Sequence, residues 1–177
     1  MNIILASKSL QRKIILEKLN LKFSIIEPNI NERITNKDHE NPKEYCSNLA
    51  FRKANKISLL HPNSYVIGAD TIIYFKNRII GKPKSKKDAT KYLKSFNRNI
   101  HHVYTAVCII NKSEAINKSL IDKTIVTFNN INNQDIDFYI NNHNSLNKAG
   151  GYGIQDWSSI FIKKIDGCYY NVVGFPL

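Results

Sequence analysis

Acidic residues, cysteines and long hydrophobic runs are all scarce in this sequence, and these shortages limit what kind of protein it can be. Asp and Glu together number 14 against 26 Lys and Arg, which gives a formal net charge of +12. Such a surface is expected to attract polyanions: nucleic acid, an anionic membrane or a phosphorylated small molecule. No apolar run approaches the ~20 residues that a spanning helix needs, and no basic leader precedes the apolar residues 3–6. We therefore predict a cytoplasmic protein that engages no membrane.

The few cysteines and histidines also argue against metal and disulfide scaffolds. Cys46, Cys108 and Cys168 are odd in number, far apart and outside any CxxC pair. They fit neither a disulfide framework nor a zinc ribbon, and they indicate a reducing compartment. His101 and His102 lack a third ligand at metal-binding spacing. No segment matches GxxxxGK followed by Ser or Thr, so a Walker phosphate loop is excluded.

The composition and periodicity that are present indicate one α/β domain. The 177 residues are 42% hydrophobic and 23% charged, which is typical of a folded chain. Helix-like and strand-like segments alternate, so we predict a single domain over residues 1–177 with a mixed β-sheet and flanking helices. Strands are predicted at 3–6, 23–27, 65–75, 79–80, 103–110, 120–128, 160–165 and 169–173.

Four helices are predicted from their caps and apolar spacing. The first begins after Ser9, and its apolar face is expected to consist of Leu10, Ile14, Ile15 and Leu19. The second begins at Asn41-Pro42, and Lys53 falls in the middle of its apolar stripe. Ser85 caps the third, and a short fourth covers 135–140. The polar stretches 111–118 and 141–156 are predicted to be loops.

Residues 7–12, Ser-Lys-Ser-Leu-Gln-Arg, lie where a strand ends and a helix begins. Free N–H groups of the first helical turn, the hydroxyls of Ser7 and Ser9 and the cations Lys8 and Arg12 can converge there on a phosphate. The alternative is ordinary helix capping by the serines, with the basic side chains in solvent. Taken alone, the segment is a hypothesis for an anion site.

Lys53, Asp70 and Lys82 are charged residues in unusual settings. Lys53, on an apolar stripe, must either extend its ammonium group to solvent or meet an anion. Asp70 interrupts an apolar strand and is the best candidate base, with a hydrogen-bonded Asp at a strand bend as the alternative. Pro83 holds Lys82 on a short, stiff loop, as a third fixed cation or as part of a plain basic turn.

The segment Gly150-Gly151-Tyr152-Gly153-Ile154-Gln155 combines three glycines with an aromatic ring and an amide. This composition lets backbone approach a ligand while Gln155 hydrogen-bonds a planar heterocycle. A glycine-rich loop by itself is weak evidence for a site. It gains weight only from the rest of the chain.

Eight short blocks occur along the whole chain in a distinctive order and spacing. They are SxSxxR at 7–12, NINE at 29–32, LAFRKA at 49–54, GADT at 68–71, GKP at 81–83, HHVYT at 101–105, NKAGGYGIQ at 147–155 and NVVGFPL at 171–177. Together they resemble the Maf family of nucleoside triphosphate pyrophosphatases. Asp70-Thr71 and Ile154-Gln155 resemble the branch that acts on dTTP and UTP rather than on 7-methyl-GTP.

The resemblance implies a fold, a reaction and a set of site residues. The fold is the α/β fold shared with inosine triphosphate pyrophosphatases, with two lobes around a central cleft, in a homodimer with a divalent cation, Mg²⁺ or Mn²⁺. The reaction is hydrolysis of a nucleoside triphosphate substrate between its α and β phosphates. By position, Ser7, Arg12, Lys53 and Lys82 would hold the phosphates, with Gln11 and Thr71 beside the substrate. Glu32 and Asp70 would serve the metal or the water, and Gln155 would face the base.

Some positions depart from the family pattern. Gln11 replaces one of a pair of arginines, and Asn31 and Asn147 replace acids. The family generally continues past the position of Leu177 into a further helix, and without it apolar surface is expected to be exposed. These departures keep a second hypothesis open, a catalytically weakened nucleotide-binding regulator of septum formation. A third, a nucleic-acid-binding module, rests on net charge alone; recognition signatures are absent, so no specific nucleic-acid binding is expected.

Overall fold

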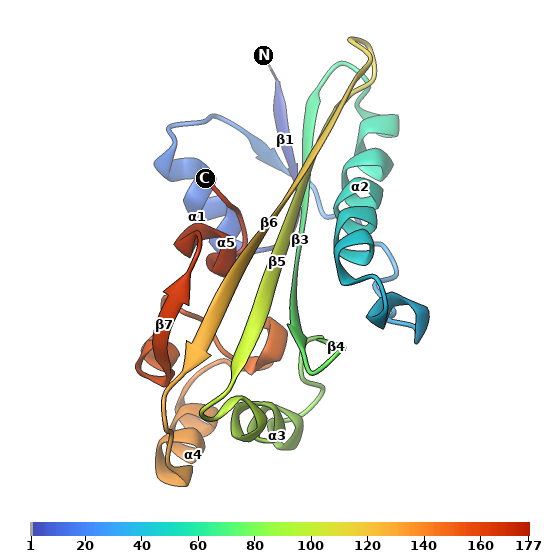
Figure 1. The fold of residues 1–177 in the computed structure, drawn as a ribbon. Helices are drawn as coiled ribbons and strands as arrows, with labels where there is room; N and C mark the ends of the chain where they lie inside the picture. Colours follow the sequence, from blue (N-terminus) through green and yellow to red (C-terminus); the bar gives the residue numbers. More distant parts are fainter. Residues whose placement is uncertain (1) are drawn as a thin grey trace.

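Seven strands form one mixed β-sheet in the computed structural model of the protein, which describes residues 2–177 (Figure 1). The strand order is β2-β1-β3-β5-β6-β7, with β4 paired to β3. Pairing is parallel between β1 and its neighbours β2 and β3, and antiparallel elsewhere. The strands are β1 (Ile3–Ala6), β2 (Ser24–Ile25), β3 (Tyr65–Phe75), β4 (Arg78–Ile80), β5 (Ile100–Asn111), β6 (Ile116–Phe128) and β7 (Ile162–Asp166). The predicted mixed α/β fold is confirmed.

Helices cover both faces of the sheet and one of its ends (Figure 1). The α-helices are α1 (Leu10–Lys18), α2 (Pro42–Leu60), α3 (Lys86–Phe96), α4 (Asn133–Asn142) and α5 (Tyr169–Val173). Short 3₁₀ helices are η1 (Lys37–His39), η2 (Ala149–Gly151) and η3 (Trp157–Phe161). Within residues 2–177, no helix combines the length and the apolar character that crossing a membrane requires.

Alternation along the strands divides the core between the two faces of the sheet. On β1, Ile4 packs with the α2 residue Leu49, whereas Leu5 packs with the α1 residues Ile15 and Leu16. Successive strand side chains point to opposite faces, so four apolar residues in a row bury both sides at once. A third cluster lies at the far end of the sheet and joins α3, α4 and the 3₁₀ helices around Phe96, Phe128 and Tyr139. The first two clusters, on the two faces of the sheet around β1, form the core of one lobe. The third forms the core of the other lobe.

Four predicted elements differ in the structure. The strand predicted at 160–165 begins only at residue 162, because residues 160 and 161 belong to η3. Residues 169–173, predicted as a strand, form α5, because Asn171 is fully buried and donates through Nδ2 to Val103 O and Thr124 Oγ1. Tertiary contacts here override the β-branched and aromatic composition. Much of the predicted loop 111–118 belongs to the strands β5 and β6. The buried face of α1 is Arg12, Ile15 and Leu16, while Leu10 and Leu19 are exposed.

Gly68 allows α2 to lie directly on β3. A Cβ at this position would stand 2.3 Å from the Ala50 carbonyl oxygen and 2.6 Å from the Ala54 amide nitrogen. Both are helix backbone atoms, which cannot rotate away as a side chain can. The close approach brings Lys53 of α2 over Asp70 of β3, two residues beyond the glycine.

We predict that Gly68→Ala forces α2 away from the sheet and lowers the free energy of unfolding by at least about 1–3 kcal/mol, the usual cost of overpacking. Chemical denaturation monitored by circular dichroism measures the change. Gly81→Ala is the control, because the nearest atom to its Cβ is the flexible Ile34 Cδ1 at 3.4 Å. Equal stabilities of the two variants would contradict this account of the contact.

Candidate functional site

A cavity of about 1430 Å³ opens between the two lobes. Its lining includes the turn between β1 and α1, the start of α1, the middle of β3, the loop after β4 and the segment between α4 and η3. All nine site residues predicted from the sequence line this one cavity: Ser7, Gln11, Arg12, Glu32, Lys53, Asp70, Thr71, Lys82 and Gln155. The structure therefore brings them together, and their chemical roles stay predictions.

Arg12 is held in place by three different parts of the chain. Ser9 is the N-cap of α1 and accepts from the Arg12 backbone N–H, as its sequence position predicts. The guanidinium donates from Nε to Gly174 O at 2.8 Å, from Nη1 to Ser7 Oγ at 3.2 Å and from Nη2 to Thr71 Oγ1 at 2.9 Å. Arg12 is 8% exposed, so its charge lies at the floor of the cavity in a fixed orientation.

Lys53 joins the two carboxylates of the cavity. Its Nζ lies 2.6 Å from Asp70 Oδ1 and 2.8 Å from Glu32 Oε1. Of the two interpretations of Lys53, the structure shows the contact with anions and not the extension into solvent, because the side chain is only 8% exposed. Asp70 is buried likewise, whereas Glu32 is 44% exposed and reaches in from the η1 side of the cleft.

The two carboxylates have opposite shifts in pKa. Burial is the largest influence on Asp70 and raises its pKa above the ordinary value, although Lys53 and Arg12 oppose this shift. Partial burial also acts to raise the pKa of Glu32, but Lys53, Lys82 and Arg12 together hold it below the ordinary value. Asp70 therefore takes up a proton more readily than Glu32, which is the property expected of a base rather than of a fixed counter-ion.

The loops that carry Lys82 and Gln155 contact each other across the cavity mouth. The Gly150 N–H donates to Gly81 O at 3.0 Å. Gly150 and Gly151 have φ of +66° and +80°, which a side chain would strain, so the glycines in this segment have a structural cause. Lys82 and Gln155 are both exposed at the rim, and Gln11 is half-buried beside Arg12. The rim side chains are thus open to solvent, while the two backbone segments that carry them are hydrogen-bonded to each other.

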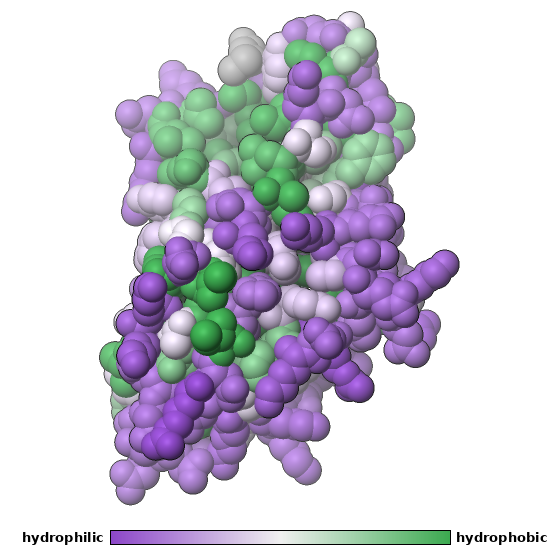
Figure 2. Space-filling view, viewed as in Figure 1, coloured by the Kyte–Doolittle hydropathy of each residue, from purple (hydrophilic) through white to green (hydrophobic). Residues whose placement is uncertain are grey.

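The cavity is also lined by Lys8, to which the sequence argument gave a phosphate-binding role, and by Lys84 and Lys148, to which it gave none. Lys8 pairs with Glu27 at 2.8 Å, Lys148 contacts Asp156, and Lys84 follows Pro83 on the Lys82 loop. Lys84 belongs to a strongly basic segment: residues 76–98 contain nine lysines or arginines and one acid, Asp88. All nine basic side chains are exposed, and Figure 2 shows mostly hydrophilic residues over the lower part of the view, where α3 lies. This clustering of charge was visible in the sequence.

The carboxylates of Asp70 and Glu32 also fit a divalent cation whose coordination shell is completed by substrate. Within residues 2–177, no group of three or more His, Cys, Asp or Glu side chains could hold a metal ion. Mg²⁺ is, however, usually bound by one or two carboxylates together with substrate phosphates and waters. Lys53 occupies Asp70 Oδ1 and Glu32 Oε1, and no hydrogen bond from residues 2–177 reaches Oδ2 or Oε2. Two carboxylate oxygens are therefore available for a cation.

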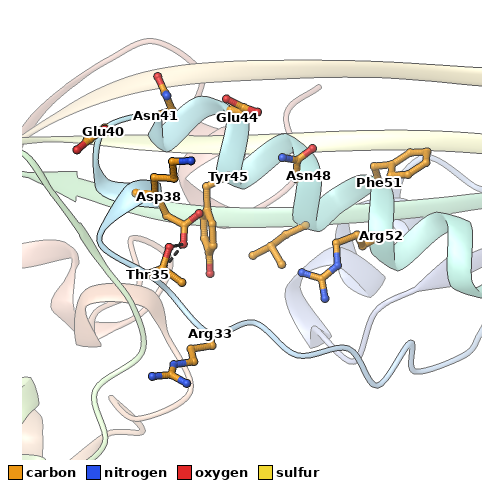
Figure 3. Close-up of a pocket in the computed structure, with 12 residues that line it drawn as sticks. Arg33, Thr35, Asp38, Glu40, Asn41, Glu44, Tyr45, Asn48, Phe51 and Arg52 are labelled. Carbon is orange, nitrogen blue, oxygen red and sulfur yellow. Dashed lines mark hydrogen bonds between the residues drawn. The ribbon is translucent and has the colours of Figure 1, made fainter.

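A second, smaller hollow of about 730 Å³ adjoins the cleft at the start of α2 (Figure 3). Tyr45 and Arg52 extend from α2 toward this space (Figure 3), and Thr35 donates to Asp38 at its edge. Its charges are of both signs, with three acids, Asp38, Glu40 and Glu44, against Arg33, Lys37 and Arg52. The larger cavity is the candidate site because positive charge dominates there.

Comparisons of the sequence with known proteins find a family model and curated relatives that match nearly the whole chain. A family model described as "Maf-like protein" matches residues 2–177. A protein of Geobacillus sp. (strain WCH70) named dTTP/UTP pyrophosphatase is 41% identical over 176 residues, 99% of this chain and 92% of the relative. One of the same name from Thermosipho africanus (strain TCF52B) is 43% identical over 177 residues, 100% and 88% of the two chains. A solved nucleoside-triphosphatase / dITP/XTP pyrophosphatase from Mycobacterium abscessus is 11% identical, with a TM-score of 0.46 and coverage of 74% of this chain and 76% of that one.

We predict that Lys53→Met lowers the free energy of unfolding by about 3–5 kcal/mol near neutral pH, because it leaves a buried carboxylate unpaired. The pKa of Asp70, already raised by burial, should rise further once the cation is gone. The folded variant then takes up a proton that the unfolded chain does not, so the loss of stability should shrink as the pH falls from 8 toward 5.

Denaturant titrations of the variant and the wild type across this pH range measure the effect. Lys56→Met, which removes an exposed lysine of the same helix bonded only to Asn29 O, is the control. A deficit that stayed constant with pH would show that Asp70 is not the group left unpaired.

Proposed function

This chain belongs to the Maf family, and on that premise we propose that it is a nucleoside triphosphate pyrophosphatase acting on dTTP- and UTP-like nucleotides. The single observation that carries the proposal is that the cations Arg12, Lys53 and Lys82 line the same cavity as Asp70. The names of the relatives at 41% and 43% identity support the substrate class. The products are a nucleoside monophosphate and pyrophosphate.

Neutralising the substrate charge is the first task of the site. A triphosphate is strongly anionic, and attack on its α-phosphorus requires positive groups around the phosphates before a base can help. Arg12 provides an oriented guanidinium at the floor, whereas Lys82 can reach the phosphates from the rim. Ser7, whose Oγ accepts both from Arg12 and from the Ser9 N–H, completes the cradle at the start of α1. The helix N-terminus favours a phosphate at the same place.

Asp70 is the residue placed to act on the water. Its raised pKa makes it the stronger proton acceptor of the two carboxylates, and Lys53 keeps it oriented through Oδ1. A water that gives its proton to Asp70 attacks the α-phosphorus, the bond from that phosphorus to the bridging oxygen breaks, and pyrophosphate leaves. Glu32 and Asp70 would hold Mg²⁺ or Mn²⁺, which when bound supplies further positive charge to the phosphates.

Gln155 and Thr71 are proposed to face the nucleoside. Gln155 lies at the exposed rim on the loop after Tyr152, where its amide can pair with the edge of a pyrimidine. Gln11 occupies the position next to Arg12 where the family has a second arginine.

The single domain, the homodimer and the cytoplasmic location expected from the sequence stay predictions, and light scattering of the purified protein tests the dimer.

The proposal is tested by measuring pyrophosphate release from dTTP, UTP, CTP, GTP and ATP with Mg²⁺ or Mn²⁺. Release of pyrophosphate rather than orthophosphate locates the cleavage between the α and β phosphates. A nucleotide-binding regulator would bind without releasing either. No specific observation in the structure favours that alternative.

We predict that Asp70→Asn lowers kcat by ~10² or more, the usual scale for losing a general base, with a much smaller change in nucleotide binding. Steady-state kinetics on UTP and calorimetric titration with a non-hydrolysable UTP analogue separate the two effects. Asp166→Asn, an exposed carboxylate of β7, is the matched control. Turnover near the wild-type value would remove Asp70 from the mechanism.

We also predict that Gln11→Arg raises kcat/KM for UTP and dTTP, because it adds a cation beside Arg12 in the cavity. Gln134→Arg, on the exposed face of α4, adds the same charge away from the site and should leave kcat/KM unchanged. An unchanged or lower kcat/KM for Gln11→Arg would mean that the glutamine is not a weakness of this site.

A further inference from the structure

We propose that Thr105, which does not face the cavity, positions Arg12 through a one-way chain of hydrogen bonds that also passes through Thr71 and ends at Asn171. The inference rests on the proposed function of Arg12 as a phosphate ligand. The chain runs from Arg12 Nη2 to Thr71 Oγ1 at 2.9 Å, then to Thr105 Oγ1 at 3.0 Å and to Asn171 O at 2.7 Å. It links β3, β5 and α5 beneath the site.

The two ends of the chain decide the direction of every bond in it. A guanidinium can only donate, and a backbone carbonyl oxygen can only accept. Thr105 has a single hydroxyl hydrogen, which goes to Asn171 O. It has none left for Thr71, so Thr71 must be the donor in the bond between the two threonines. Thr71 consequently accepts from Arg12 and directs its own hydrogen away from the cavity.

This direction has a consequence for substrate contact. Thr71 presents only an oxygen lone pair to the cavity, because its hydrogen is already engaged with Thr105. An acceptor repels phosphate oxygens, so the phosphates should gather on the Arg12 side. The substrate group or water that meets Thr71 must donate. Thr105 thereby divides the cavity into a side at Arg12 that binds phosphate and a side at Thr71 that accepts hydrogen bonds, although Thr105 itself does not touch the ligand.

The hydrogen-bond chain is anchored at its Asn171 end. Thr105 and Asn171 are both 0% exposed. Asn171 is bound through Nδ2 to Val103 O at 3.1 Å and to Thr124 Oγ1 at 2.9 Å. Three residues further on, Gly174 O accepts from Arg12 Nε at 2.8 Å. The α5 region therefore fixes two N–H groups of the guanidinium, one directly and one through the threonines. Ser7 Oγ accepts a third from Nη1, which leaves two of the five N–H groups for phosphate.

The decisive experiment compares Thr105→Val with Thr105→Ser in steady-state hydrolysis of UTP. Valine keeps the shape of threonine but removes the hydroxyl, whereas serine keeps the hydroxyl and loses a methyl group. Both substitutions disturb a buried site, so both should lower Tm. Only Thr105→Val should raise KM, by about tenfold for one misplaced charged hydrogen bond, with kcat changed less than threefold. The serine variant should retain a KM within twofold of wild type.

A double-mutant cycle shows whether Thr105 acts through Arg12. In an Arg12→Ala background, Thr105→Val should leave KM unchanged, because the group that it positions is gone. Binding of a non-hydrolysable UTP analogue, measured by calorimetry, should show the same non-additivity. A similar rise in KM for the valine and serine variants, or full additivity with Arg12→Ala, would overturn the proposal.

Two controls keep the result interpretable. Ser58→Ala removes a fully buried hydroxyl that donates to Asn55 O in α2. Because this hydroxyl is not part of the hydrogen-bond chain from Arg12 to Asn171, the variant should leave KM unchanged. If Thr105→Val does not yield folded protein, the pair Thr105→Ala and Thr105→Ser isolates the same hydroxyl. Absence of pyrophosphate release by wild type would contradict the proposed function, whereas activity that is indifferent to the Thr105 hydroxyl contradicts only this inference.

Discussion

The buried contact between Lys53 and Asp70 is the constraint on which the rest of the site depends. Two charges so far from water are stable only as a pair, because removing either partner leaves an ion in a low-dielectric interior. The 2.6 Å contact requires α2 and β3 to lie closer than any side chain between them would permit. Gly68 meets that requirement. The placement of Asp70 in the cleft and the packing of α2 on β3 thus have one cause.

The buried Arg12 beneath the cleft likewise depends on having its hydrogen-bond partners present. Arg12 is buried on the same face of α1 as Ile15 and Leu16, whereas Leu10 is 62% exposed. That orientation of α1 is reasonable only because Ser7, Thr71 and Gly174 together satisfy the guanidinium. The polar contacts, rather than the hydrophobic effect alone, orient α1.

Charge is distributed unevenly over the molecule, and the unevenness matches the proposed chemistry. The segment 76–98 runs from β4 past Lys82 and along α3, so its basic groups extend from the cavity onto the surface. Clefts lined by one sign of charge raise the local concentration of oppositely charged ligands. A nucleoside triphosphate approaching from this side meets exposed lysines first and the buried pair last. Part of the net charge of +12 is thus placed where a polyphosphate would use it.

The sequence by itself indicated residues that line the cavity, because the signals are local: Ser9 as an N-cap, Lys53 on an apolar stripe, Asp70 in an apolar strand. It also determined most of the elements through their periodicity. Only the tertiary structure decided that residues 169–173 form a helix, because the burial of Asn171 depends on strand residues 68 and 47 positions earlier. It alone decided which partner each polar group has. Hydrogen-bond direction along Arg12, Thr71 and Thr105 depends on atoms brought together from distant positions, and no spacing in the sequence encodes it.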